Sequence, residues 1–274
     1  MRVLLTGAAG SIGRVLLDGL ADRGHDVVGV DLVPQPAGVD GAWHTADCTD
    51  PDAVADVFAT EFAESSLDAV VHLAGHAGEA SLPHSLTSHV VTTAALLDAM
   101  VEHGVGRFVY ASSNHAVGQT PRAGLPDGLL TTDARPRPDS FYGVAKVAAE
   151  ALASLYADRH GIDSVACRIG SFRAEPRTVR HLSTWLSHDD GVRMVEAALT
   201  CPGPGFAVLY GISRNTRAWW DLAPGRALGY DPLDDAEEWA DRVEAGPDDA
   251  EENARVGGDY TLDGRERPAF DRSS

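Results

Sequence analysis

The sequence predicts an α/β protein built on a doubly wound parallel sheet, with a smaller C-terminal portion. Apolar segments of strand length alternate with segments of helical periodicity along most of the chain, a pattern typical of parallel strands joined by crossover helices. A glycine-rich turn follows the first apolar segment, where an open α/β sheet binds ligands. The length of 274 residues suits one large α/β unit without a second independent domain.

The chain opens as a strand, a tight turn and a helix. The apolar residues 3–5 lead into Gly7, Gly10 and Gly13, spaced G-x-x-G-x-x-G, and residues 14–20 have helical periodicity. Glycines let the backbone approach a pyrophosphate closely, and the free N–H groups and dipole of a helix N-terminus favour an anion. The alternative is an ordinary strand-to-helix turn.

A carboxylate follows the second strand, residues 26–30. Asp31 lies eighteen residues beyond Gly13, close to the distance at which such an acid reaches the ribose of a dinucleotide. It would accept hydrogen bonds from both ribose hydroxyls and repel a 2′-phosphate. A solvent-facing loop aspartate is the alternative. Together with the glycines, Asp31 predicts NAD rather than NADP.

The remaining elements follow in order. Strands are expected at residues 42–48, 67–73, 107–111, 164–170 and 206–210. Helices are expected at residues 86–103, around Tyr142, from His188 with acids in its first turn, and within the acidic tail at 233–250. The polar residues 112–115 follow the strand at 107–111, at the carboxyl edge of the sheet.

Tyr142 and Lys146 form a candidate catalytic pair. Lys146 is the only lysine in the chain, and Tyr142 precedes it by four residues in a segment rich in helix formers, so both side chains share one helical face. A nearby ammonium favours the phenolate and lowers a pKa that is ordinarily about 10. We therefore expect Tyr142 to act as a base; a solvated surface pair is the alternative.

Composition excludes several classes of partner. Forty-one acidic and twenty-two basic residues give a net charge of −19, which argues against nucleic acid and anionic membrane surfaces. Within this acidic chain, Arg173, Arg177 and Arg180 predict an anion site, although we favour a simple surface role for Arg173 and Arg177. Three cysteines without metal-ligand spacing, and the absence of a signal peptide or a membrane-spanning run, predict reduced thiols in a cytoplasmic protein.

These residues resemble the extended branch of the short-chain dehydrogenase/reductase superfamily, which combines the glycine pattern with Tyr-x-x-x-Lys. Within that branch, most of the chain is similar to the uronate dehydrogenase family, whose signatures resemble residues 112–115, 168–171, 181–190 and 219–221. The resemblance implies a Rossmann domain that binds NAD at residues 1–170 and a substrate-binding portion at residues 171–274. It also implies a homo-oligomer formed through the helix that bears Tyr142 and the helix before it.

The resemblance implies a role for individual positions. Ser113 joins Tyr142 and Lys146 as a catalytic residue. The implied cofactor contacts are Gly7, Gly10, Ser11, Ile12, Gly13, Asp31, Leu32, Asp47, Cys48, Leu73, Ala74, Gly75, Tyr142 and Lys146. The implied substrate contacts are Ser113, Asn114, His115, Tyr142, Ser171, Arg180 and Tyr260. His89 and Thr92 depart from the family's Asn-x-x-Gly-Thr pattern, and Tyr260 stands where the family has phenylalanine.

The implied activity is oxidation of the C1 hydroxyl of a cyclic uronic acid, such as D-glucuronate or D-galacturonate, to the aldarolactone. Hydride passes to NAD, and no metal is required. One alternative is an NAD-dependent glucose-6-phosphate or other aldose 1-dehydrogenase, because archaeal examples resemble residues 219–221 and 228–230. The other is a non-catalytic NAD-sensing protein, which would be expected to lose the Tyr-x-x-x-Lys pair.

Overall fold

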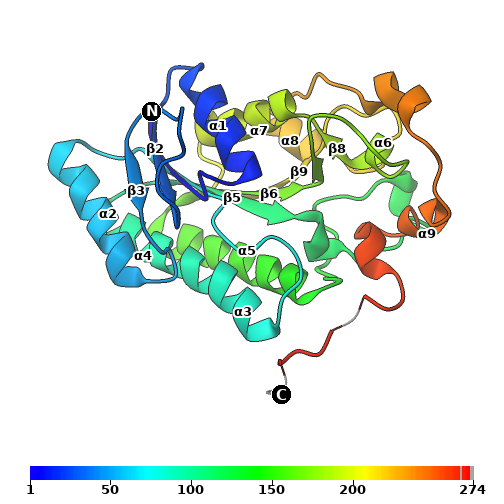
Figure 1. Cartoon of the computed structure of the whole chain (residues 1–274), viewed down its shortest axis with the longest axis horizontal. Coiled ribbons are helices and arrows are strands. Elements are labelled where there is room, and N and C mark those ends of the chain that lie inside the picture. The colour runs from blue at the N-terminus through cyan, green and yellow to red at the C-terminus, as the bar shows by residue number, and fades with distance from the viewer. Residues whose placement is uncertain (266, 272–274) are drawn as a thin grey trace.

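A computed structural model of the chain describes residues 1–265 and 267–271, apart from the side chain of residue 64. Its main sheet has seven strands, all parallel, in the order β3-β2-β1-β4-β5-β6-β9 (Figure 1). The strands are β1 (Arg2–Thr6), β2 (Asp26–Asp31), β3 (Trp43–Thr45), β4 (Ala69–His72), β5 (Arg107–Ser113), β6 (Asp163–Ile169) and β9 (Phe206–Gly211). The strand order reverses between β1 and β4, which creates a ligand crevice at the carboxyl ends of these strands. The predicted doubly wound sheet is confirmed.

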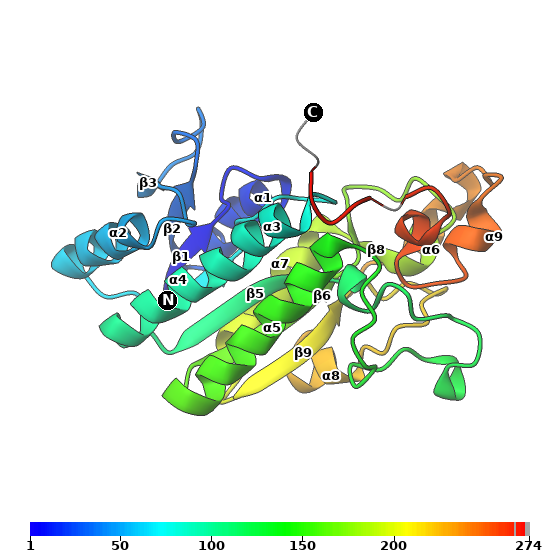
Figure 2. The same ribbon diagram turned by 90° about the horizontal axis from the view of Figure 1, so that it is seen from below.

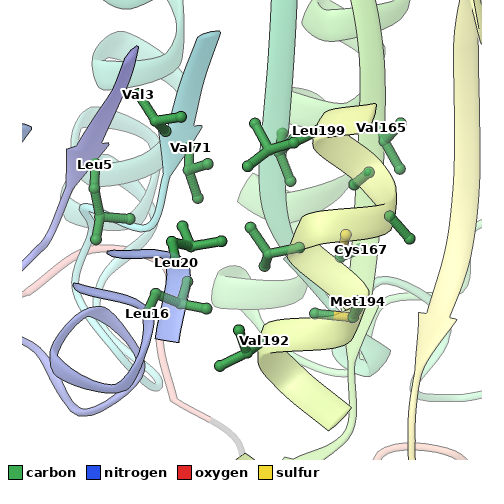
Figure 3. Close-up of a cluster of buried hydrophobic side chains, with 14 of the residues drawn as sticks. Val3, Leu5, Leu16, Leu20, Val71, Val165, Cys167, Val192, Met194 and Leu199 are labelled. Carbon is green, nitrogen blue, oxygen red and sulfur yellow. The ribbon is translucent and has the colours of Figure 1, made fainter. Parts of the chain in front are cut away.

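Helices cover both faces of the sheet. The helices α1 (Ser11–Ala21) and α7 (His188–Thr200) pack on one face, and α2 (Pro51–Glu64), α4 (Thr92–His103) and α5 (Phe141–His160) pack on the other (Figure 2). Side chains alternate along each strand, so Val3 and Leu5 of β1 join the first core whereas Leu4 joins the second. Figure 3 shows the first core, where Leu16 and Leu20 of α1 and residues of α7 meet the strands.

The helix that carries Tyr142 and Lys146 has a defined cap at each end. The Ser140 hydroxyl accepts a hydrogen bond from the Gly143 N–H (3.0 Å), and Gly161 ends the helix at a φ of 70°, a conformation that favours glycine. The helix α7 begins at His188 and is capped by Ser187, whose hydroxyl accepts a hydrogen bond from the Asp190 N–H (2.9 Å). Asp189 and Asp190 occupy its first turn, as the sequence predicts.

The predicted helix at residues 86–103 is more irregular than its sequence indicates. It is built from α3 (Leu82–Leu86), a π-helix η1 (Thr87–Val91) and α4. A π-helix inserts one extra residue per turn and turns the side chains that follow it, which is common at functional sites. The extra residue lies next to the ligand crevice, because Thr87, Ser88 and His89 line the cavity described below.

The C-terminal portion adds small elements at one end of the sheet. They are β7 (Ser171–Phe172), α6 (His181–Thr184), β8 (Trp185–Leu186), α8 (Ala223–Ala227), η4 (Ala236–Arg242), α9 (Asp249–Glu252) and η5 (Gly258–Thr261), while η2 (Asn114–Val117) and η3 (Pro126–Gly128) follow β5. The predicted tail helix at 233–250 is wrong: Gly246 and Pro247 separate η4 from α9, and both residues disfavour a helix interior. The division at residue 170 stays a prediction, and β9 and α7, which lie beyond it, belong to the main layers.

Within the described part of the chain, no helix combines the length and the apolar character needed to cross a bilayer.

Candidate active site

A cavity of about 1080 Å³ opens along the carboxyl ends of the strands. Its lining comes from the glycine turn, the ends of β2 and β4, the π-helix η1, the end of β5, the first turn of α5 and the C-terminal η5. Every site residue predicted from the sequence lines this cavity except Ser171 and Arg180. Segments separated by up to 253 residues, from Gly7 to Tyr260, therefore surround a single space.

The glycine turn fits a dinucleotide phosphate. Gly7 has a φ of 70°, and a Cβ atom there would lie 2.8 Å from the Ala74 nitrogen. A Cβ atom on Gly13 would overlap the backbone of Gly7 and Ala8. Gly10 caps α1 and no side chain caps its first turn, so helix N–H groups face the cavity.

Asp31 ends β2 beside this turn. Its Oδ2 atom accepts a hydrogen bond from the Ala9 N–H (2.9 Å) and its Oδ1 atom accepts from the Val33 N–H (3.3 Å). Each carboxylate oxygen has a second lone pair, so the fixed carboxylate retains capacity to accept from ribose hydroxyls. The neighbouring Leu32 is 67% exposed, which leaves an apolar side chain available to a flat ring.

Two further residues at the cofactor end have defined local roles. The Oδ1 atom of Asp47 accepts from both the N–H and the hydroxyl of Thr49 (2.8 Å each). Burial raises the pKa of the Cys48 thiol to about 12, so this cysteine lines the cavity as a neutral group. Leu73, Ala74 and Gly75 continue from β4 into the same wall.

Tyr142 and Lys146 lie on the first two turns of α5, close to the end of β5. The Lys146 ammonium donates a hydrogen bond to the Ala111 carbonyl (2.7 Å) and lies 5.3 Å from the centroid of the Tyr142 ring. Ser113, the last residue of β5, lies beside Tyr142, and its hydroxyl acts to lower the pKa of that tyrosine. The three predicted catalytic side chains are thus together.

The electrostatics of this pair differ from the sequence prediction. Burial raises the pKa of Tyr142 to about 12, and the nearby Ser113 hydroxyl opposes that rise. Burial also lowers the pKa of Lys146 to about 7, against the attraction of Glu150. The expected lowering of the tyrosine pKa is therefore wrong for this structure, because burial disfavours the charged phenolate and is the largest cause of the shift.

The N-terminus of α5 is anchored by a residue that the sequence analysis missed. Glu79, in the loop after β4, accepts hydrogen bonds from the Phe141 and Tyr142 N–H groups through its two carboxylate oxygens (3.1 Å each). An acid at this helix end is favoured by the helix dipole. The pairing spans more than sixty residues, so no local pattern in the sequence reveals it.

His89 packs directly against the candidate base. Its ring meets the Tyr142 ring edge-on at 5.2 Å, and its Nε2–H group donates to the His76 carbonyl (3.0 Å). Burial, with the nearby Lys146 charge, lowers the pKa of His89 to about 3. The imidazole is therefore neutral at physiological pH.

At the sugar end, Asn114, His115 and Tyr260 line the cavity. The Asn114 amide donates to the Val256 carbonyl (3.0 Å), and Arg180 donates to the same oxygen and to the Glu252 and Arg255 carbonyls.

Both Arg180 and Asn114 hold the C-terminal segment that carries Tyr260. Arg180 lies beneath Gly258, outside the cavity lining, and the Ser171 hydroxyl is paired with Thr184 (3.0 Å). Trp219 and Trp220 pack in a buried cluster with Tyr210.

These features define a class of protein. Residues 3–189 match the NAD dependent epimerase/dehydratase family, and the chain belongs to that family.

Individual relatives narrow the likeness. The chain is 36% identical to a uronate dehydrogenase of Pseudomonas putida over 90% of its own length and 89% of that protein. It is also 36% identical to an NAD-dependent glucose-6-phosphate dehydrogenase of Haloferax volcanii, over 86% of this chain and 95% of that one. A crystal structure of a mutant uronate dehydrogenase from Agrobacterium tumefaciens, complexed with NAD, is similar over 99% of both chains, with a TM-score of 0.86 and 34% identity.

Proposed function

We propose that this protein oxidises the C1 hydroxyl of a cyclic hexuronic acid, D-glucuronate or D-galacturonate, to the aldarolactone with NAD. The observation that carries the proposal is the meeting of Ser113, Tyr142 and Lys146 in the cavity that also holds the glycine turn and Asp31. Near-full-length similarity to uronate dehydrogenases supports it. When bound, NAD supplies an electron-deficient nicotinamide ring that accepts hydride.

The protein's side chains remove the proton and hold the reacting oxygen. Tyr142 removes the proton of the C1 hydroxyl as C1 loses its hydride, so that C1 becomes the carbonyl carbon of the lactone. Ser113 holds the reacting oxygen next to the phenol. Lys146 supplies the positive charge that favours the phenolate. No charged side chain other than Lys146 is needed at the reacting oxygen.

Arg180 is the proposed partner of the sugar carboxylate. Arg180 is 9% exposed, and among the described residues no carboxylate oxygen lies within 4.0 Å of its guanidinium nitrogens. Burial lowers the pKa of Arg180 to about 10. The guanidinium donates hydrogen bonds only to carbonyl oxygens, while the carboxylates of Asp259, Glu252 and Asp139 attract it from farther away. An incoming carboxylate that formed hydrogen bonds with this buried cation would stabilise it further. Arg180 lies under Gly258, two residues from the cavity-lining Tyr260.

A phosphate site is the second candidate. Burial lowers the pKa of His181 to about 4, and the nearby positive charges of Arg173, Arg177 and Arg180 contribute to that lowering. A cluster of this kind also suits a sugar phosphate, and the Haloferax relative is named for glucose 6-phosphate. The motifs shared with uronate dehydrogenases in residues 168–171 and 181–190 favour the uronic acid. A purely NAD-sensing protein would have no use for the intact Tyr142–Lys146 pair.

The proposed assembly is a homo-oligomer in the cytoplasm. The outer surfaces of α4 and α5, side by side on one face of the sheet, expose Val101, Val144 and Leu155 at 37–39%, and two such faces could bury one another. The three cysteines are free and buried, as suits a reducing compartment. The charge of −19 disfavours nucleic acid as a partner.

One assay tests the activity. Purified protein is offered glucuronate, galacturonate, glucose and glucose 6-phosphate with NAD, and NADH formation is followed, with Tyr142→Phe as the catalytic control. We expect the highest kcat/KM for a uronate. A preference for glucose 6-phosphate would overturn the uronate assignment and move the arginine cluster to a phosphate role, and an absence of NADH from every sugar would leave the sensing alternative.

A further inference from the structure

A histidine and an aspartate are paired at the sugar end of the cavity. The Nδ1 atom of His115 lies 2.8 Å from the Oδ2 atom of Asp139, whose side chain is 0% exposed. The second carboxylate oxygen accepts a hydrogen bond from the Ser140 hydroxyl (2.8 Å). Asp139 belongs to the loop before α5 and does not line the cavity, whereas His115 does.

The fold makes room for this carboxylate at the junction of three segments. A Cβ atom on Gly118, after η2, would overlap the Asp139 carboxylate, and so would a Cβ atom on Gly257, before η5. The Gly257 N–H donates to the Gly118 carbonyl (2.9 Å), which joins these two segments around Asp139. A buried carboxylate is costly unless its oxygens are hydrogen-bonded, and here His115 and Ser140 supply those bonds.

The ring of His115 is held from both sides. Its centroid lies 5.7 Å from that of Tyr142 and 4.3 Å from that of Tyr260. Among the hydrogen bonds of the described residues, none uses the Nε2 atom of His115. The ring therefore presents a nitrogen without a protein partner to a cavity that also contains the candidate base.

The chemistry of the pair determines which proton His115 keeps. An ionised carboxylate can only accept, so Nδ1 must carry the hydrogen, and in a neutral imidazole Nε2 is then an acceptor. We infer that Asp139 is a positioning residue that fixes the Nδ1–H tautomer of His115, so that Nε2 accepts a hydrogen bond from a hydroxyl of the bound sugar. This inference rests on the proposed function only for the identity of the donor.

Nitrogen NMR of the histidine side chain tests the tautomer directly. The protein is labelled with ¹⁵N-histidine and saturated with NAD, and the His115 signals are identified as those lost in His115→Gln. We expect the wild type to show a protonated Nδ1 and a bare Nε2 at about pH 8, and Asp139→Asn to shift the ring toward the Nε2–H form, because an amide can donate as well as accept. A wild-type ring with Nε2 protonated, alone or together with Nδ1, would overturn the inference.

Kinetics test whether the tautomer serves the sugar. Asp139→Asn should raise KM for the sugar about three- to tenfold, because this is the loss of affinity expected when one hydrogen bond is removed. KM for NAD should change less than about twofold. In the His115→Gln background the same substitution should change KM for the sugar less than about twofold, since Asp139 acts through His115. The matched control is Asp133→Asn, an exposed acid of the same loop.

The outcomes separate the two claims. Equal KM penalties from Asp139→Asn with and without His115 would refute action through the histidine, even if the tautomer is as expected. If the wild type oxidises no uronic acid, the proposed function fails, and the kinetic arm is run on whichever sugar it does oxidise. The NMR result is read in either case, because it requires no turnover.

Discussion

Replacement of Lys146 should change the pH dependence of catalysis in a way that follows from the two perturbed pKa values. With Lys146 at about 7 and Tyr142 at about 12, the pair loses its first proton near pH 7 and keeps its second until near pH 12. Between these values one proton remains. The base-competent arrangement has that proton on Lys146 and a phenolate on Tyr142.

The population of this arrangement is small. Because the pKa of Tyr142 lies well above that of Lys146, the phenolate–ammonium form is a minor part of the singly protonated pair, and attraction between the two charges raises it. The fraction of the protein in the phenolate–ammonium form grows tenfold per pH unit up to about pH 7 and is constant above that pH. In the wild type, log kcat/KM should therefore rise with unit slope and level off near pH 7.

Two variants separate charge from titration. Lys146→Met removes the group that loses the first proton, so the inflection near pH 7 should disappear and log kcat/KM should continue to rise throughout the alkaline range. Lys146→Arg keeps a positive charge but cannot titrate, so it should also lose the inflection near pH 7 while retaining more activity than methionine. The assay is kcat/KM for the sugar at saturating NAD, from about pH 5 to about pH 10. A wild-type profile still climbing tenfold per unit above about pH 8, or an inflection that survives in Lys146→Met, would refute the reasoning.

Three further predictions concern single side chains. Tyr142→Phe removes only the ionisable oxygen and should reduce turnover about 10²- to 10⁴-fold. NAD binding, measured by fluorescence titration, should be retained. A variant that keeps more than about a tenth of wild-type activity would exclude Tyr142 as the base. Asp31→Ala should narrow the preference for NAD over NADP, measured as the ratio of kcat/KM, and comparable wild-type efficiency with both would contradict the assignment. Arg180→Ala should lower the ratio of glucuronate to glucose oxidation roughly ten- to a hundredfold, with Arg180→Lys intermediate; an unchanged ratio would mean that another residue binds the carboxylate.

The fold and the cofactor end were predictable because their signals are local. Strand and helix periods, the spacing of the three glycines and a carboxylate at the end of β2 are each contained in a short stretch of sequence. The predicted strand at 42–48 shrinks to Trp43–Thr45. The π-helix was missed because one added residue leaves the amphipathic pattern nearly unchanged.

The sugar end was less predictable because its contacts join distant segments. Asn114 and Arg180 both donate to the Val256 carbonyl, which lies 142 and 76 residues away from them in the sequence. Glu79 caps α5 by accepting from the Phe141 N–H, 62 residues away. The direction of the Tyr142 pKa depends on its burial, which no spacing of residues encodes. Sequence similarity therefore identifies which positions matter, whereas their electrostatic state follows only from the packed structure.

The solitary lysine is explained by the state of this pair. Glu150, one turn beyond Lys146 on α5, raises the lysine pKa, but its carboxylate is already held by Arg168 (2.9 and 2.8 Å) and by the Ser112 hydroxyl (2.5 Å). Its remaining pull on the ammonium is too weak to offset burial, so Lys146 titrates at about 7. A guanidinium at this position would keep its proton at any physiological pH. In a chain that otherwise uses arginine, this position therefore carries a cation whose charge depends on pH near neutrality.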